Sequence, residues 1–294
     1  MPPALSFPFA RIRRQWLTFL VASILPLTPA AAHNWSANDL KSGPGSSLPG
    51  RRPDSLLSLD YLRLLADDTG SILTSPLTWD RQDWQLAGGL TGMVLASAAL
   101  DHNIKREAQE GRTKELDQFT KKTQRFGAEY SFLVLGGFEA YGYCARDARA
   151  KAVALDGVTA SIIASGIIVP ILKYGVGRAR PNVATHTFHF KPFSSNSSFP
   201  SGHTTQAFAV ASVITAHYAQ WWVQGLAYGA AGMVGYSRIV QDAHFASDVV
   251  AGAVIGAVIG RAVVRRHDHP SAGGVSVEPY FDGRASGIVL SRDY

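Results

Sequence analysis

Six apolar stretches between residues 86 and 264 constrain this chain more than any other feature of its sequence. They lack the alternation of apolar and polar residues that a half-buried strand requires, and they are rich in Ala, Gly, Ile and Val. Their lengths fit helices better than strands. We therefore predict an all-α fold, a helical bundle of about six core helices. The stretches are Leu86–Leu100, Tyr130–Cys144, Val153–Leu172, Thr204–Gln220, Trp221–Tyr236 and Ala246–Val264.

The first part of the chain has the pattern of an export signal. Three arginines form a basic region, the apolar stretch Trp16–Leu27 follows, and Ala30-Ala31-Ala32 offers a small-residue cleavage site before His33. An uncleaved membrane anchor is the alternative, although the stretch is short for a spanning helix. In both cases we expect the rest of the chain to lie outside the cytoplasm, in a bacterial periplasm, either soluble or associated with the inner membrane.

The segments that flank the core differ from it in composition. A Ser-, Gly- and Pro-rich linker precedes a short predicted helix, Ser55–Ala66. Near the end of the chain, apolar and polar residues alternate on both sides of Asp282-Gly283, which predicts a short β-hairpin-like tail. We divide the chain into a signal peptide, a linker with a short helix, a core and a tail, over residues 1–32, 33–83, 84–266 and 267–294.

Charge and cysteine content argue against several classes of function. The net charge of +6 is spread along the chain without a basic stripe, so we predict no nucleic-acid binding. The single cysteine, Cys144, permits no intrachain disulfide and no zinc site, and we expect a buried, inert thiol. Residues 101–129 mix positive and negative charges, which indicates a solvated helix and loop. His186-x-x-His189 lacks further ligands and is predicted to lie in a solvated loop, not in a metal site.

The motif Ser237-Arg238-x5-His244-x3-Asp248 combines a cation, a histidine and a carboxylate. On a helix, His244 and Asp248 would lie on one face, about one turn apart. The carboxylate could then accept the proton of one ring nitrogen, which would leave the other nitrogen as a nucleophile. An ordinary helical hydrogen bond is the alternative, but Arg238 adds a guanidinium that is suited to phosphate binding.

The motif Pro200-Ser201-Gly202-His203 is typical of a helix start. Ser201 is a good N-cap residue, and the apolar stretch begins at Thr204. The backbone N–H groups of Ser201, Gly202 and His203 would point out of the helix end, where an anion is favoured. His203 would then be placed to donate a proton to a leaving oxygen. A capped helix with an idle histidine explains the tetrapeptide equally well.

The motif Lys173-x6-Arg180-Pro181 ends an apolar helix. Gly175 and Gly177 break the helix, and Arg180 should be extended because the residue before a proline avoids the α region. Lys173 and Arg180 would both be free to turn back over a phosphate. A basic helix C-terminus is the alternative, and it explains this motif when the motif is taken alone. Arg178 falls outside the pattern and is predicted to be a surface residue.

In this order and spacing, the three motifs resemble the signature of the type 2 phosphatidic acid phosphatase (PAP2) superfamily, which includes bacterial acid phosphatases and vanadium haloperoxidases. The pattern matches without a substitution, and the resembling core covers residues 84–266. The resemblance implies a helical bundle that hydrolyses phosphoesters without a metal or another cofactor. It implies that three cations bind the phosphoryl oxygens with help from two residues of the helix start: Lys173, Arg180, Arg238, Ser201 and Gly202.

The resemblance also assigns the histidines, which residue chemistry alone left open. It implies that His244 attacks phosphorus to form a phosphohistidine, and that Asp248 orients His244. It implies that His203 protonates the leaving group and then activates water. Two alternatives stay open: a vanadate-dependent haloperoxidase with the same anion cage, and a non-catalytic envelope protein that binds an anion.

The sequence leaves the substrate open between a lipid phosphate, an isoprenoid pyrophosphate and a soluble phosphoester. Thr204–Ser237 carries no formal charge and could make two short membrane crossings, whereas Glu139 and Asp156 interrupt other apolar stretches. If all three helices before Lys173 crossed a bilayer after an exported N-terminus, the site would face the cytoplasm. We therefore expect a periplasmic site on a protein that is soluble or partly embedded in the membrane, with a lipid phosphate as substrate if it is embedded.

Overall fold

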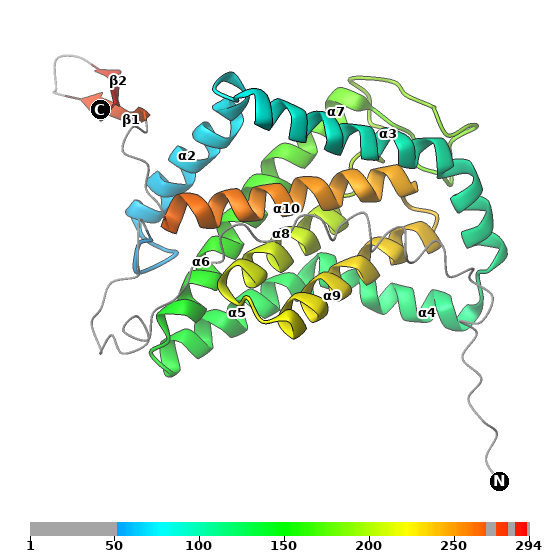
Figure 1. The fold of residues 1–294 in the computed structure, drawn as a ribbon, viewed down its shortest axis with the longest axis horizontal. Helices are drawn as coiled ribbons and strands as arrows, with labels where there is room; N and C mark the ends of the chain where they lie inside the picture. The colour runs from blue at the N-terminus through cyan, green and yellow to red at the C-terminus, as the bar shows by residue number, and fades with distance from the viewer. Residues whose placement is uncertain (1–51, 269–274, 282–285, 293–294) are drawn as a thin grey trace, which may run out of the picture.

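The computed structural model of the protein describes residues 52–268, 275–281 and 286–292 (Figure 1). It consists mainly of helices, as predicted, whereas the predicted signal peptide and most of the linker lie outside the described residues. The α-helices are α2 (Leu59–Thr74), α3 (Arg81–Glu110), α4 (Lys114–Thr123), α5 (Glu129–Cys144), α6 (Ala148–Ser161), α7 (Val169–Val176), α8 (Gly202–His217), α9 (Trp221–Val240) and α10 (Ala246–Asp268). Shorter helical segments are η2 (Ser75–Leu77), η3 (Gln124–Gly127) and the π-helical η4 (Ile162–Ile168).

All six predicted apolar stretches lie in helices of the bundle. Five of them fall largely within single helices, namely α3, α5, α8, α9 and α10. The sixth, Val153–Leu172, is divided among α6, η4 and α7, because a π-helical segment interrupts the regular α-helical hydrogen bonding. The apolar pattern therefore predicted where helices form, but not the irregular segment in the middle of the longest apolar stretch, Val153–Leu172.

The elements at the two ends of the described chain are smaller. Helix α2 begins at Leu59, later than predicted, because the Ser58 hydroxyl accepts the N–H of Tyr61 and caps the helix there. Its buried face packs against α6. Beyond α10, β1 (Val275–Phe281) pairs with β2 (Ser286–Arg292) in antiparallel register, with Phe281 opposite Ser286.

The core of the bundle is centred on α8, against which α6, α9 and α10 pack (Figure 1). Every residue from Thr204 to Val213 is buried. A helix that is buried on all sides needs an apolar sequence on all sides, which accounts for the absence of charge in this stretch. The main apolar cluster joins α8 to its neighbours through Val153, Ala160, Ile163, Ala209, Val213, Ile259 and Val263.

Glycines allow α10 to approach α8 closely. A Cβ at Gly252 would lie 2.6 Å from the carbonyl oxygen of Ser201, and a Cβ at Gly256 would lie 2.3 Å from that of Thr205. Neither distance leaves room for a side chain, and small residues are what allow two helix backbones to come this close. The contact holds the start of α8 beside the start of α10, so the sequence motifs at these two helix starts are brought together.

At the other end of α10, a buried charge network ties α2 to the core. Asp156 on α6 accepts hydrogen bonds from Nε and Nη2 of Arg52 (2.9 and 2.7 Å) and lies 2.7 Å from Nε2 of His217. Both ring nitrogens of His267 lie 2.6 Å from carboxylate oxygens, one of Asp156 and one of Asp68. Because an ionised carboxylate only accepts hydrogen bonds, His267 donates from both nitrogens and is therefore protonated.

We expect His267→Ala to destabilise the fold strongly. The substitution leaves Asp68 and Asp156 buried without their shared cation, and removing one partner of a buried ion pair lowers the free energy of unfolding by about 3 to 5 kcal/mol. Arg63→Ala, which removes only an exposed ion pair with Asp60, serves as the control and should change the stability little. Thermal unfolding of the purified variants measures both. Equal unfolding midpoints for the two variants would show that the network does not stabilise the fold.

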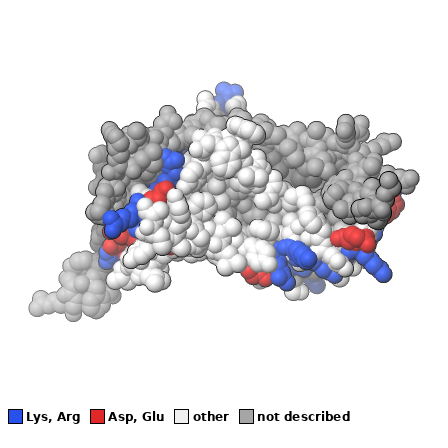
Figure 2. Space-filling view, turned by 90° about the horizontal axis from the view of Figure 1, so that it is seen from below, with Lys and Arg blue, Asp and Glu red and all other residues white. Residues whose placement is uncertain are grey.

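Large apolar side chains are exposed along three outer helices. Figure 2 shows the lower face of the molecule in Figure 1, on the side of α5 and α9, where a broad area without charged side chains separates charged groups near its two ends. Leu133 on α5 is 68% exposed and Trp221 on α9 is 84% exposed. Single exposed apolar residues are ordinary, but an extended area of this kind marks an interaction surface. The residues on α3, α5 and α9 that we call the apolar belt are Trp84, Leu86, Leu95, Phe132, Leu133, Val134, Tyr141, Tyr143, Trp221, Trp222 and Leu226.

Two helical segments of the described chain are long and apolar enough to cross a membrane, judged by length and composition. They are Ala148–Val176, with a mean hydropathy of 1.9, and Ala246–Asp268, with a mean hydropathy of 1.7. Both are mostly buried inside the bundle. The segments of high hydropathy are thus mostly interior, whereas the apolar belt lies on α3, α5 and α9.

Candidate active site

The three sequence motifs meet at one end of the bundle, where α7 and α9 end and where α8 and α10 begin. The chain leaves α7 through Gly177, whose φ of 59° lies in the left-handed region. A Cβ at this position would lie 1.8 Å from the carbonyl oxygen of Lys191, so the turn requires glycine. The turn leads into the loop 177–201, which carries Arg178 and Arg180 and ends at the start of α8.

The start of α8 differs in part from the prediction. Ser201 is the N-cap residue, but its hydroxyl lies 2.9 Å from Oγ1 of Thr204 and accepts no backbone N–H of the helix. Its own N–H donates to the carbonyl oxygen of Asp248 (3.0 Å), so Ser201 holds α8 against α10 and directs no N–H toward an anion. The N–H groups of Gly202 and His203 have no acceptor among the described residues, and these two remain available at the helix start.

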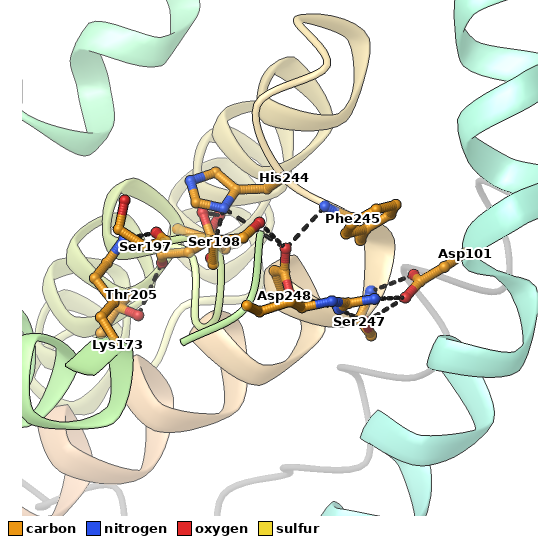
Figure 3. Close-up of polar contacts among 12 residues, drawn as sticks. Asp101, Lys173, Ser197, Ser198, Thr205, His244, Phe245, Ser247 and Asp248 are labelled. Atoms are coloured by element: carbon orange, nitrogen blue, oxygen red, sulfur yellow. Dashed lines mark hydrogen bonds and ion pairs between the residues drawn. The ribbon is translucent and has the colours of Figure 1, made fainter. Parts of the chain in front are cut away.

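His244 precedes α10 and does not lie on it, contrary to the prediction. The helix begins at Ala246, and Nδ1 of His244 is 3.8 Å from Oδ2 of Asp248, too far for the predicted hydrogen bond. This Nδ1 lies 2.8 Å from the carbonyl oxygen of Ser198 (Figure 3). A carbonyl oxygen only accepts, so Nδ1 carries the hydrogen and Nε2 keeps its lone pair. The tautomer is the predicted type, but a backbone carbonyl fixes it in place of the carboxylate.

Asp248 organises the loop around His244 without bonding to the imidazole. Its side chain is fully buried, and Oδ2 accepts hydrogen bonds from the Ser198 hydroxyl (2.6 Å) and from the Phe245 N–H (2.9 Å). Ser198 therefore links the carboxylate to the imidazole, since its hydroxyl bonds to Asp248 and its carbonyl to His244 (Figure 3). Sequence reasoning missed Ser198, because it takes this place only when the loop folds over the start of α10.

Arg178 and Asp101 are the clearest corrections to the sequence predictions. Arg178 was predicted to be a surface residue, but only 2% of it is exposed. Its guanidinium forms ion pairs of 2.7 Å with Oδ1 of Asp248 and with Oδ2 of Asp101. Asp101 falls in the segment that was predicted to be solvated, yet it is fully buried on α3. These partners are far apart along the chain, so no local pattern marks them as a pair.

The three motif cations make few contacts with the described residues. The ammonium group of Lys173 donates to the carbonyl oxygen of Ser197, and Nη1 of Arg238 donates to the side-chain oxygens of Gln124 and of Gln241 (3.1 Å to Gln241). Nε of Arg238 is buried and has no hydrogen-bond partner among the described residues. Arg180 is exposed. Donors therefore remain available on these side chains for an anionic ligand.

No carboxylate pairs with these cations among the described residues, since Asp248 pairs with Arg178. Arg180 lies close enough to Lys173 and to Arg238 for their positive charges to repel one another. Like charges that are held together in a partly buried place destabilise one another unless an anion lies between them. The arrangement is therefore suited to a phosphate group that carries two negative charges.

The electrostatic environment keeps both histidines neutral. Burial, with the nearby positive charge of Arg238, lowers the pKa of His203 to about 4. Burial also lowers the pKa of His244, although the negative charge of Asp248 opposes this shift. Neutral imidazole is the form that can attack phosphorus. His203 must gain a proton before it can act as an acid, and a bound phosphate anion would favour this by raising the pKa of His203.

Two other predictions concern residues outside this arrangement. Cys144 is exposed at the end of α5, so the expectation of a buried thiol was wrong. In the loop between the first two motifs, the rings of His186 and His189 stack with their centroids 5.6 Å apart. Within the described ranges, no group of three or more His, Cys, Asp or Glu side chains is arranged as metal ligands would be.

Comparison with known proteins agrees with the motifs. The model of the PAP2 superfamily matches residues 157–270, which contain all three. Lipid A 1-phosphatase of Porphyromonas gingivalis is 28% identical over 170 residues, which cover 57% of this chain and 36% of that protein. Lipid A 1-phosphatase of Rhizobium johnstonii is 36% identical over 102 residues, which cover 33% of this chain and 41% of that protein. The chain thus spans less than half the length of the curated relatives it matches.

Two crystal structures are also similar to this chain. LpxE of Aquifex aeolicus has a TM-score of 0.46 and 26% sequence identity, and the match covers 56% of this chain and 95% of that chain. A transmembrane PAP2-type phosphatidylglycerolphosphate phosphatase of Bacillus subtilis has a TM-score of 0.46 and 22% identity, and the match covers 60% of this chain and 92% of that chain.

Proposed function

We propose that this chain, whose residues 157–270 belong to the PAP2 superfamily, is an exported, metal-independent phosphatase that removes phosphate from a lipid phosphate monoester through a phosphohistidine. The observation that carries the proposal is the uncompensated positive charge at the end of the bundle. Lys173, Arg180 and Arg238 lie together there, while the carboxylate of Asp248 forms its ion pair with Arg178. Such an arrangement favours a dianionic phosphate monoester over neutral ligands.

In the proposed first step, Nε2 of His244 attacks phosphorus. A P–N bond forms while the bond from phosphorus to the leaving oxygen breaks, and the electron pair of that bond goes to the oxygen. His203 donates the proton that the leaving oxygen needs. The three cations and the N–H groups of Gly202 and His203 hold the remaining phosphoryl oxygens, where negative charge is concentrated. Ser201 contributes by fixing the helix start.

In the proposed second step, water attacks the phosphorus of the phosphohistidine. The neutral His203 accepts a proton from the water, the P–N bond breaks, and its electron pair returns to Nε2 of His244. Inorganic phosphate then leaves. Because the cations supply the neutralisation of charge, the scheme uses no metal ion. Asp248 acts at a distance in both steps, through Ser198 and the loop that carries His244.

A lipid phosphate is the substrate class that the surface favours. The apolar belt would contact membrane lipid, and its tryptophan and tyrosine residues are typical of protein surfaces at the boundary between membrane and water. Three curated relatives are named lipid A 1-phosphatases, which supports the same class. Association with a membrane would bring the site to a phosphate that projects from the lipid layer. Export rests on the predicted signal over residues 1–32.

Phosphate release by the purified protein tests this function. With EDTA present, we expect kcat/KM for phosphatidic acid or lipid A in mixed micelles to exceed that for a soluble sugar phosphate by about tenfold or more. Faster phosphate release from an isoprenoid pyrophosphate in the same micelles would identify that lipid class as the preferred substrate. Equal rates on lipid and sugar esters would contradict a lipid substrate, and inhibition by EDTA would contradict a metal-independent reaction. Halide oxidation with added vanadate and peroxide, without phosphate release, would favour a haloperoxidase.

A further inference from the structure

Every donor of the Arg178 guanidinium is used inside the protein. Nη1 donates to Oδ1 of Asp248 (2.7 Å) and to Oγ of Ser247 (2.7 Å). Nη2 donates to Oδ2 of Asp101 (2.7 Å) and to the carbonyl oxygen of Thr187 (2.6 Å), to which Nε also donates (3.2 Å). A guanidinium has five N–H donors, so none remains for a substrate. Arg178 is therefore a fixed internal group, unlike the three motif cations.

Aromatic rings enclose this guanidinium. Its central carbon lies 4.2 Å from the ring centroid of Phe245 and 5.3 Å from that of Phe190. Both rings attract the positive charge through their faces. They also exclude water, and charges interact more strongly where water is excluded. Arg178 therefore attracts the neighbouring carboxylates more strongly than an exposed arginine would.

Asp101, on α3, binds the guanidinium of Arg178 and the first turn of α10. Its Oδ1 accepts the N–H of Ser247 (2.9 Å), and its Oδ2 accepts both the Ser247 hydroxyl (2.6 Å) and Arg178. Ser247 lies in the first turn of α10, next to Asp248 (Figure 3). Asp101 thereby ties a helix outside the matched family segment to the turn that carries the site carboxylate.

We propose that Asp101 and Arg178 are positioning residues for the nucleophilic imidazole of His244, on the premise that the site is the phosphatase proposed above. The contacts run from Asp101 through Arg178 to Asp248. They continue from Asp248 through Ser198 to Nδ1 of His244 (Figure 3). Neither positioning residue has a donor or acceptor directed at a substrate. They act on the orientation of Asp248 and on how strongly its negative charge reaches His244.

The effect of the Asp248 charge on the pKa of His244 changes in a direction that can be measured. Apart from Asp248, the charged and titratable groups that act on His244 are Lys173 from α7, His203 from α8 and Arg238 from α9. Arg178→Met removes a positive charge that offsets Asp248, so the pKa of His244 should rise. Asp101→Asn removes a negative charge that offsets Arg178, so the pKa of His244 should fall.

The pH profile of kcat/KM in these variants tests the proposal. The acidic limb should move to higher pH in Arg178→Met and to lower pH in Asp101→Asn, because the reaction needs a neutral His244. In both variants kcat should fall by about 10- to 100-fold while KM stays within about threefold, since the substrate contacts are intact. Arg178→Lys keeps the charge but loses the planar fork. It should leave the limb in place and recover part of kcat.

Matched variants at the far end of the bundle separate positioning from stability. Arg266→Met and Asp68→Asn break an ion pair of 3.1 Å there, and should lower thermal stability without moving the limb. With an active wild type, this inference would be overturned if the acidic limb stayed in place, or moved in the same direction, in both Arg178→Met and Asp101→Asn. If Arg178→Met does not fold, the positions of the limb in Asp101→Asn and Arg178→Lys test the inference. A wild type that releases no phosphate would overturn the proposed function itself.

Discussion

His244→Ala is expected to abolish phosphate release, with a fall in kcat of about 10⁴-fold or more. The variant lacks the nitrogen that we propose accepts the phosphoryl group, whereas the three cations and the start of α8 remain in place. We therefore expect inorganic phosphate to bind the variant with an affinity close to that for wild type. Initial rates on a lipid phosphate, paired with equilibrium binding of inorganic phosphate to the same samples, measure both quantities.

The intermediate provides a second measurement for the same variant. Wild type that is quenched during turnover of a radiolabelled substrate should carry label with the acid lability of a phosphohistidine, and His244→Ala should carry none. His189→Ala is the matched control, because it removes a histidine from the neighbouring loop outside the set of site residues. It should label and turn over like wild type. A His244→Ala protein that kept more than about 1% of the wild-type rate would rule out His244 as the nucleophile.

His203→Ala is expected to separate substrates by their leaving groups. A lipid alcohol is a poor leaving group, so loss of the acid should lower the rate of phosphohistidine formation by about 10²- to 10⁴-fold. Nitrophenolate leaves without a proton, so formation of the intermediate from nitrophenyl phosphate should change little. In the proposed second step, hydrolysis of the intermediate also uses His203, so the variant should release one burst of nitrophenolate per protein molecule and then slow down. Rapid-mixing absorbance measurements resolve the burst.

The outcome for His203→Ala also tests whether His203 transfers a proton or only supports the start of α8. A disturbed helix start would weaken phosphate binding and slow the first turnover of both esters by the same factor. His203→Gln, which keeps a polar side chain but cannot transfer a proton, should behave like His203→Ala. Equal losses on the two esters in the first turnover would contradict the assignment of His203 as the acid.

Most of the helices could be predicted from the sequence, because the signals for them are local. An apolar stretch that is long and lacks strand alternation favours a helix over a strand, and Gly177 marks the end of α7. The uncharged stretch Thr204–Ser237 was harder to interpret. Its first half forms α8, which is buried inside the bundle, whereas its second half forms most of α9, which carries part of the apolar belt. Hydropathy along the chain does not distinguish these two kinds of surroundings.

The predictions that failed within the site concern partners that are distant in sequence. Arg178 was predicted to be a surface residue because its partner Asp101 lies on α3, 77 residues away along the chain. His244 and Asp248 have helical spacing, but the helix begins only after His244, and the carbonyl oxygen of Ser198 accepts the hydrogen bond from Nδ1. A spacing along the chain predicts a contact only if the intervening residues adopt the assumed conformation.

By itself, the sequence predicted which side chains would bind and transfer a phosphoryl group, and it predicted that they gather near helix ends. Only the tertiary structure decided how these groups are held: Arg178 neutralises Asp248, Ser198 orients His244, and the motif cations have no carboxylate partner among the described residues. The physical reason is that the chemical type of a residue is a local property. The charge, tautomer and orientation of a buried group depend on which neighbours replace water around it, and the packing of α3, α8 and α10 sets those neighbours.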